Sequence, residues 1–207
     1  RLRRSPTSGF LVQSVGDNNV GPFNLGFTFS FYGNDFRSIH LCSNGWLSFT
    51  STATYYSNQP LPSKTNTPEN FVALFWDDLN FTLGGSAYYY SDVKRFIVEY
   101  KGVYHYGGSG PYTFEVILYP NGKILYQYLS MSPPVDNATI GIQNQDQTIG
   151  LEIAFNTSYM HDNLAVLIYE GVDWLKYSPH LAWMAAFDRM GVLAKPHNQD
   201  NIPGACR

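Results

Sequence analysis

Two runs of aromatic and branched residues within 112–128 flank the turn sequence Pro120-Asn121-Gly122, and together they leave few folds open to the chain. Asn-Gly favours the positive φ angles that a tight hairpin turn requires. Apolar residues alternate along both runs: Phe114, Val116, Leu118, Ile124, Tyr126 and Tyr128. Such alternation predicts an antiparallel β-hairpin with one buried face.

The same rhythm recurs along most of the chain. Three phenylalanines lie at period two within residues 27–31, and residues 36–49 predict a second hairpin around Ser43-Asn44-Gly45. The nearly continuous apolar run 71–76 predicts a buried central strand. Roughly ten to twelve short strands without βαβ periods indicate an all-β fold, an antiparallel β-sandwich of jelly-roll type.

The composition narrows the class of protein. The chain has 207 residues, a length that suits one all-β domain with short extensions. Aromatic residues make up 16% and charged residues 14%, a balance typical of secreted β-proteins. The net charge is −3 and there is no basic stripe, which argues against nucleic-acid binding. No apolar run approaches the ~18 residues of a membrane helix, so we expect no membrane span. From the composition we expect an extracellular or cell-surface protein.

The ends of the chain differ from its middle. We expect residues 1–10 to be disordered or added by cloning, and residues 11–170 to form the β-sandwich. Residues 171–207 are predicted to be a linker with a helical tail, since 181–190 contain good helix formers and Gly191 follows them. Cys42 and Cys206 either pair or stay free, because two distant cysteines define no disulfide framework.

Short motifs rich in aromatic, glycine and asparagine residues follow one another between residues 26 and 165. They are Gly26-Phe27-Thr28-Phe29, Phe31-Tyr32-Gly33, 43–49, Phe75-Trp76-Asp77-Asp78-Leu79, 110–114, Tyr119-Pro120-Asn121-Gly122, 138–144 and 161–165. In this order they resemble the nidogen-like β-domains, and the resemblance covers residues 20–170. The likeness is greatest to bacterial versions attached to secreted subtilisin-like proteases and surface proteins.

The resemblance implies an extracellular accessory or adhesion module, and it supplies no catalytic set that could be carried over. Trp174-Leu175 and Ser178-Pro179 also resemble the opening of an Ig-like repeat that often follows such a domain. The sequence departs from that repeat after Pro179, where the helical segment replaces the expected glycine-rich strand. Residues 171–207 are therefore also open to interpretation as the start of a truncated following domain.

Two adjacent carboxylates follow the predicted buried strand 71–76. Asp77 and Asp78 come directly after it, and Asn80 lies two residues further on. At a strand end the backbone turns, so all three side chains can face one hard cation, and Ca²⁺ is the cofactor that this oxygen set favours. The alternative is that one aspartate caps the loop while the other is solvated. No spacing of the 5 histidines indicates a zinc site.

Glu99 and Glu115 are acidic residues inside predicted strands. With Asp77 or Asp78 they could act as the acid and base of a glycoside hydrolase, which needs carboxyl groups ~5–5.5 Å apart for retention of configuration. The alternative, which we favour, places both glutamates on the polar faces of their strands. No residue is predicted to be catalytic unless the chain is a hydrolase.

A tyrosine- and histidine-containing loop is the predicted ligand-binding segment. Tyr104, His105 and Tyr106 precede a glycine-rich stretch, and Tyr112 follows it. Flat aromatic faces can pack on sugar rings, so a carbohydrate site is one interpretation. Structural tyrosines at the rim of a sandwich are the other.

These patterns favour a non-catalytic extracellular module that binds a carbohydrate or protein surface ligand within a larger secreted protein. The first alternative is a stand-alone glycoside hydrolase working through paired carboxylates. The second is a structural subunit of a surface assembly, because exposed edge strands allow sandwiches to join edge to edge.

Overall fold

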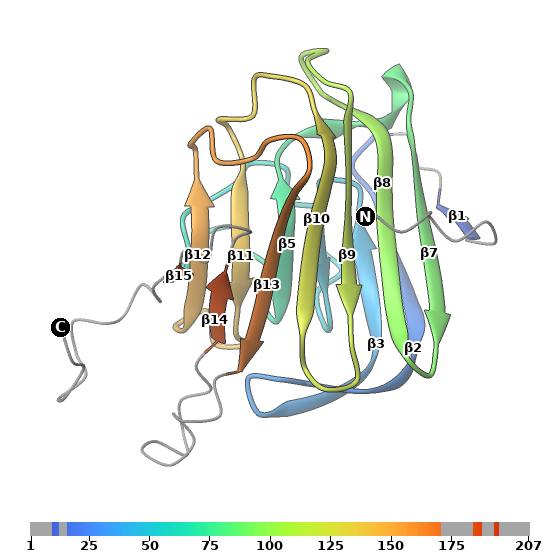
Figure 1. Ribbon diagram of the computed structural model, residues 1–207, viewed down its shortest axis with the longest axis vertical. Coiled ribbons are helices and arrows are strands. Elements are labelled where there is room, and N and C mark those ends of the chain that lie inside the picture. Colours follow the sequence, from blue (N-terminus) through green and yellow to red (C-terminus); the bar gives the residue numbers. More distant parts are fainter. Residues whose placement is uncertain (1–9, 13–15, 171–183, 188–192, 195–207) are drawn as a thin grey trace, which may run out of the picture.

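The computed structural model describes residues 10–12, 16–170, 184–187 and 193–194. Within these ranges the chain forms two antiparallel sheets that pack face to face, as Figure 1 shows with the larger sheet in front. The predicted all-β sandwich is therefore confirmed. Among the described residues, no helix has the length and the hydropathy of a membrane span.

The larger sheet carries the strong hairpin at its centre. Its strands follow the order β1 (Phe10–Val12), β7 (Ser86–Asp92), β8 (Arg95–His105), β9 (Tyr112–Leu118), β10 (Ile124–Met131), β13 (Leu164–Glu170), β14 (Met184–Phe187) and β15 (Leu193–Ala194). A short strand, β6 (Leu79–Asn80), pairs with the end of β8 and leads into a 3-10 turn, η1 (Phe81–Leu83). The predicted hairpin is β9 and β10, with Ile124 opposite Leu118 and Gly122 at positive φ.

The smaller sheet contains the predicted central strand. Its order is β12 (Gly150–Phe155), β11 (Thr139–Gln143), β5 (Phe71–Trp76), β4 (Trp46–Ser48), β3 (Asn34–Cys42) and β2 (Asn19–Phe31). Every residue of β5 is buried, as expected for an apolar run with neighbours on both edges and both faces. The second predicted hairpin is β3 and β4, joined through Ser43-Asn44-Gly45.

The predicted C-terminal helix is wrong where the structure describes it. Residues 184–187 form strand β14, which pairs with β13 from Met184 opposite Glu170 to Phe187 opposite Leu167. Helix propensity is a weak preference, and pairing with a sheet edge overrides it here. The remaining residues of the predicted helix, the end of the chain and Cys206 lie outside the described residues. The prediction for residues 1–9 also lies outside them.

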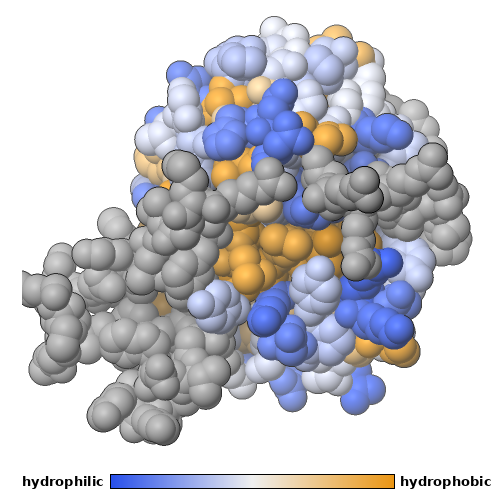
Figure 2. All heavy atoms as spheres, viewed as in Figure 1, coloured by the Kyte–Doolittle hydropathy of each residue, from blue (hydrophilic) through white to orange (hydrophobic). Residues whose placement is uncertain are grey.

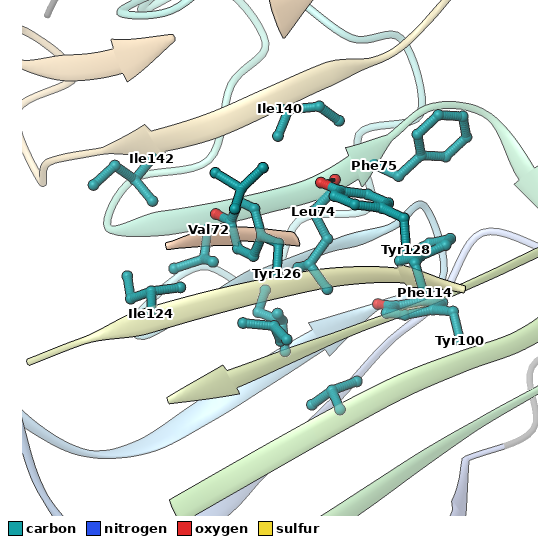
Figure 3. Close-up of a cluster of buried hydrophobic side chains, with 14 of the residues drawn as sticks. Val72, Leu74, Phe75, Tyr100, Phe114, Ile124, Tyr126, Tyr128, Ile140 and Ile142 are labelled. Atoms are coloured by element: carbon teal, nitrogen blue, oxygen red, sulfur yellow. Dashed lines mark hydrogen bonds between the residues drawn. The ribbon is translucent and has the colours of Figure 1, made fainter. Parts of the chain in front are cut away.

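One large apolar core fills the space between the sheets. It includes side chains from both layers, among them Val72, Phe75, Phe114, Tyr128 and Ile140, and Figure 3 shows them converging. A second, smaller cluster lies on the other face of the small sheet, where Trp46, Phe71 and Trp76 pack beneath the long loop 49–70. Both tryptophans donate to the carbonyl oxygen of Tyr55, at 2.9 and 3.0 Å, so they tie that loop to the sheet.

Three buried tyrosines link the two sheets through their hydroxyl groups. Tyr100, Tyr126 and Tyr128 of the large sheet donate to the carbonyl oxygens of Cys42, Gly141 and Leu74, at 2.5, 2.9 and 2.6 Å. Leu74 and Gly141 lie where the register of β5 and β11 shifts. Tyr126 and Tyr128 therefore supply donors at irregular points of the small sheet, since buried carbonyl groups need partners.

A Tyr128→Phe variant is expected to lower the free energy of unfolding by about 1–2 kcal/mol, because the buried Leu74 carbonyl loses this donor while the ring remains. Urea unfolding measures the difference. The matched control is Tyr106→Phe, which removes a hydroxyl from a ring that is 69% exposed. Equal losses for the two variants would contradict the role given to the buried bond.

The outer face of the large sheet is unusual in carrying an apolar row. Tyr90, Ile97, Ile117, Leu125 and Leu167 lie opposite one another across β7, β8, β9, β10 and β13. Figure 2 shows apolar residues gathered in the middle of this face, between more polar regions. Ile97 and Ile117 are buried, yet neither belongs to the two core clusters.

Candidate functional site

The predicted site residues that follow β5 lie at one end of the sandwich. Strand β5 ends there, β6 and η1 follow, and the loop from β8 to β9 lies beside them at the top of Figure 1. Pairing of β6 with β8 places Leu79 opposite His105 and Asn80 opposite Tyr104. The sheet therefore brings together two segments that the sequence keeps more than twenty residues apart.

Asp77 is the buried acid of this end, with 4% of its surface exposed. Its Oδ1 accepts hydrogen bonds from the backbone N–H of Asp78 at 2.9 Å and from Asn137 Nδ2 at 3.4 Å. His105 Nε2 lies 3.4 Å from the same oxygen. Burial raises the pKa of Asp77 to about 6, while the neighbouring His105 works in the opposite direction.

The hydrogen bonds of His105 fix its role. The backbone N–H of Gly107 donates to His105 Nδ1 at 2.9 Å, so in the neutral ring the proton is on Nε2, facing Asp77. A histidine that activates a nucleophile needs a free acceptor nitrogen on the side away from its carboxylate. Here that nitrogen is already bonded, so the pair is arranged as a structural link between the sheets.

Asp17, which is exposed, and Asp78, which is half-buried, are the solvent-accessible acids of the same end. Both line a surface pocket of about 610 Å³, the end pocket, whose described lining is Gly16, Asp17, Tyr56, Asp78, Leu79, Asn80, Thr82 and Tyr106. Burial raises the pKa of Asp78, and the charge of Asp17 adds to this effect while His105 opposes it. The charge of Asp17 therefore acts on Asp78 across the pocket.

A buried asparagine holds the walls of the end pocket in place. Asn44 Nδ2 donates to Asp17 Oδ1 at 2.8 Å, and its Oδ1 accepts from the backbone N–H of Leu79 at 3.1 Å. Asn44 also accepts from Asp77 N through its carbonyl oxygen, at 3.3 Å. One side chain from the turn before β4 thus fixes two segments that carry the acids.

The other predicted ligand and metal residues have local structural partners. Asn80 Oδ1 accepts from Thr82 N and Thr82 Oγ1, at 2.8 and 2.6 Å, and so caps η1. Tyr112 is buried in the core, where its ring packs 4.9 Å from that of Phe75 and its hydroxyl donates to Pro134 O. Tyr104 is half-buried. Tyr106 is the exposed member of the predicted aromatic set.

Glu99 and Glu115 do not join the aspartates. They lie directly opposite each other on β8 and β9, on the face of the large sheet away from the core. Burial raises the pKa of Glu115 to about 7, and Glu99 adds to the effect while Arg95 opposes it. The four carboxylates of the hydrolase hypothesis thus form two separate groups, one at the end of the sandwich and one on its outer face.

No group of three or more histidine, cysteine, aspartate or glutamate side chains is arranged for a metal ion among the residues that the structure describes. Cys42 is buried, and burial raises its pKa to about 12, so its thiol is protonated at neutral pH.

Sequence reasoning missed three contributors to the end pocket. Asp17 lies in the turn Gly16-Asp17-Asn18-Asn19, and Tyr56 lies in the long loop 49–70. Asn44 was recognised as a turn residue only. Gly45, which follows Asn44, was the signal available in the sequence. A buried Asn-Gly turn places the asparagine side-chain amide among backbone groups that it can bond.

Comparisons with known proteins relate the chain to a family. The model of a family described as NIDO related matches residues 5–166. A curated relative, Dendrite extension defective protein 1 of Caenorhabditis elegans, is 34% identical over 70 residues, which are 34% of this chain and 6% of the relative. The chain thus spans a small part of that relative's length. No solved structure matches the chain.

Proposed function

The chain belongs to the NIDO-related family, and we propose that it is a non-catalytic extracellular module that binds a protein or carbohydrate partner through the end pocket. Nidogen-like domains are typically extracellular accessory modules. The predicted attachment to a bacterial secreted protease or surface protein is part of the same proposal. Adhesion is the role that such an attachment would serve.

The position of the exposed aromatic side chains carries the proposal. Six large apolar side chains are exposed among the described residues: Tyr55, Tyr56, Leu83, Val93, Tyr106 and Leu129. Tyr56 and Tyr106 line the end pocket, Leu83 follows the lining residue Thr82, and Tyr55 precedes Tyr56. Tyrosine is enriched at binding interfaces because its ring is apolar and its hydroxyl is polar. Their concentration at one end supports a contact surface there.

The arrangement of the acids supports a binding role over a catalytic one. His105 has both nitrogens engaged, by Gly107 N and by Asp77. Glu99 and Glu115 lie on a different surface from Asp77 and Asp78. A glycoside hydrolase needs its acid and its base on opposite sides of one substrate bond. The glutamates and the aspartates lie on separate surfaces, so a glutamate and an aspartate do not flank one bond together.

Calcium at Asp77, Asp78 and Asn80 stays a prediction. Asp77 Oδ1 and Asn80 Oδ1 already accept hydrogen bonds within the protein. An ion at this position would have to compete with those bonds, whereas Asp78 offers its carboxylate to the end pocket.

The test is a binding screen of the isolated chain on arrays of extracellular-matrix proteins and of glycans. A Tyr56→Ser/Tyr106→Ser variant is expected to lose at least about tenfold in affinity for any partner that the native chain binds, since aromatic anchors dominate interfaces. Both positions are exposed, at 51% and 69%, so the double variant is expected to fold normally.

Val93→Ser is the matched control for the screen. Val93 is 74% exposed and lies in the turn between β7 and β8, at the opposite end of the large sheet from the β8–β9 loop. It is expected to leave every affinity unchanged. Binding that survives the double tyrosine variant but fails with Val93→Ser would refute the assignment of the contact surface.

A further inference from the structure

The described lining of the end pocket carries negative charge and contains no lysine or arginine to match it. Asp17 and Asp78 both contribute to this charge. The imidazole at this end, that of His105, lies against Asp77, with Nε2 3.4 Å from Asp77 Oδ1. The charge of Asp17 contributes to the raised pKa of Asp78, and a cation that enters between the two carboxylates stabilises both of them.

The acidic groups are held in position before a ligand arrives. Asn44 is fully buried and bonds to Asp17 Oδ1 on one side and to Leu79 N on the other. The backbone of Asp78 accepts from Tyr106 N at 2.7 Å, which keeps the loop that carries Tyr106 beside the acid. Preorganised groups lose little conformational freedom on binding, so their interactions contribute more to affinity.

Two exposed tyrosines complete the pocket. Tyr56 is 51% exposed and Tyr106 is 69% exposed, and both line it together with the two acids. The faces of tyrosine rings attract cations, and a planar guanidinium can also stack on them. Carboxylates beside aromatic faces therefore match the two recognition features of an arginine side chain.

We propose that the end pocket binds an arginine side chain presented by a protein partner. The inference rests on the proposed function and specifies its ligand. An anionic group would be repelled by Asp17 and Asp78, and a neutral sugar would donate hydrogen bonds to them but leave their charge uncompensated. Arginine is preferred over lysine because its flat, forked guanidinium can bond carboxylates in pairs and stack on tyrosine, which a compact ammonium cannot do.

The experiment is an NMR titration of the ¹⁵N-labelled chain with three small probes, N-acetyl-arginine amide, N-acetyl-lysine amide and N-acetyl-citrulline amide. Citrulline keeps the shape of arginine but is neutral. The arginine probe is expected to shift the amide signals of residues 78–80 and Tyr106 with a dissociation constant of about 1–10 mM, a range suited to a single anchored side chain. Citrulline is expected to cause no saturable shift.

Variants identify the groups responsible. Asp17→Asn and Asp78→Asn are each expected to weaken arginine binding at least fivefold, while the backbone bonds of Asp78 to Asp77 and Tyr106 are retained. Asp35→Asn is the matched control, because Asp35 is an exposed aspartate in the β2–β3 hairpin, outside the pocket lining. Unshifted spectra elsewhere show that each variant folds.

Three results would overturn the inference: a citrulline probe that binds as well as arginine, a lysine probe that binds within twofold of arginine, or arginine binding unaffected by both aspartate substitutions. The proposed function is tested separately by the array screen. If partner binding there depends on Tyr56 and Tyr106 but not on Asp17 or Asp78, the module binds at the end pocket without reading an arginine.

Discussion

A Gly45→Ala variant is expected to lose at least about 4 kcal/mol of unfolding free energy, a large part of the roughly 5–15 kcal/mol that stabilises an ordinary domain. Gly45 has φ +74°, and a Cβ added there would lie 2.0 Å from the carbonyl oxygen of Phe75 and 2.8 Å from its carbon. The Gly45 carbonyl also accepts from Leu74 N and Phe75 N, both at 3.1 Å. The two strands are therefore locked together at this point and cannot separate to admit a methyl group.

Gly33→Ala separates the steric effect from the backbone effect. Gly33 has φ +79°, nearly the same conformation, but a Cβ there would meet nothing within 4 Å. Its variant is expected to lose about 1 kcal/mol, the usual cost of alanine in the left-handed region. Urea unfolding followed by tryptophan fluorescence measures both. Similar losses at the two glycines would show that close packing against β5 is not what requires Gly45.

Replacing Glu115 by glutamine is expected to stabilise the protein at alkaline pH. Burial, and then the charge of Glu99, raises the pKa of Glu115 from 4.5 to about 7. The carboxyl of Glu115 therefore binds its proton more tightly in the folded state than in the unfolded state. Protonation of Glu115 stabilises the fold, and this contribution is complete below pH 4.5 and is lost as pH rises through about 7. A Glu115→Gln variant does not ionise and is expected to exceed the native chain by about 2 kcal/mol at pH 8.

The difference between Glu115→Gln and the native chain is expected to shrink steadily between pH 8 and pH 4.5, as chemical unfolding at a series of pH values would measure. Gln127→Glu provides the reverse test, because Gln127 lies opposite Glu115 on β10. This variant places a third carboxylate next to the pair of Glu115 and Glu99, and it is expected to lower the free energy of unfolding at pH 8. A Glu115→Gln effect that is constant with pH would contradict the assignment of the raised pKa to this group.

Local patterns in the sequence were enough to predict the strands. The alternation in β9 and β10 and the continuous apolar run of β5 each report the burial of their own residues, and the structure confirms both. The helix predicted over residues 181–190 is wrong at 184–187 because β14 depends on pairing with β13, and pairing between separate segments leaves no local signal. The alanines and the methionine of this segment are good helix formers, yet they are also accommodated in a strand.

The candidate site could be predicted only in part. Asp77 and Asp78 were visible because they follow a buried strand, but their approach to His105 depends on the pairing of β6 with β8. Tyr112 looked like a rim residue, yet alternation along β9 places it in the core. Tyr56 reaches the end pocket through the long loop that Trp46 and Trp76 anchor, a tertiary arrangement that no short motif encodes.

The most direct test of partner binding at the end pocket is an NMR map of the surface contacted by the strongest protein or glycan found on the arrays. The amide signals of residues 16–17, 78–82 and Tyr106 are predicted to change, while those of the β2–β3 hairpin and of Val93 stay in place. Changes centred instead on Ile97, Ile117 and Leu125 would place the contact on the apolar row of the large sheet and contradict the account.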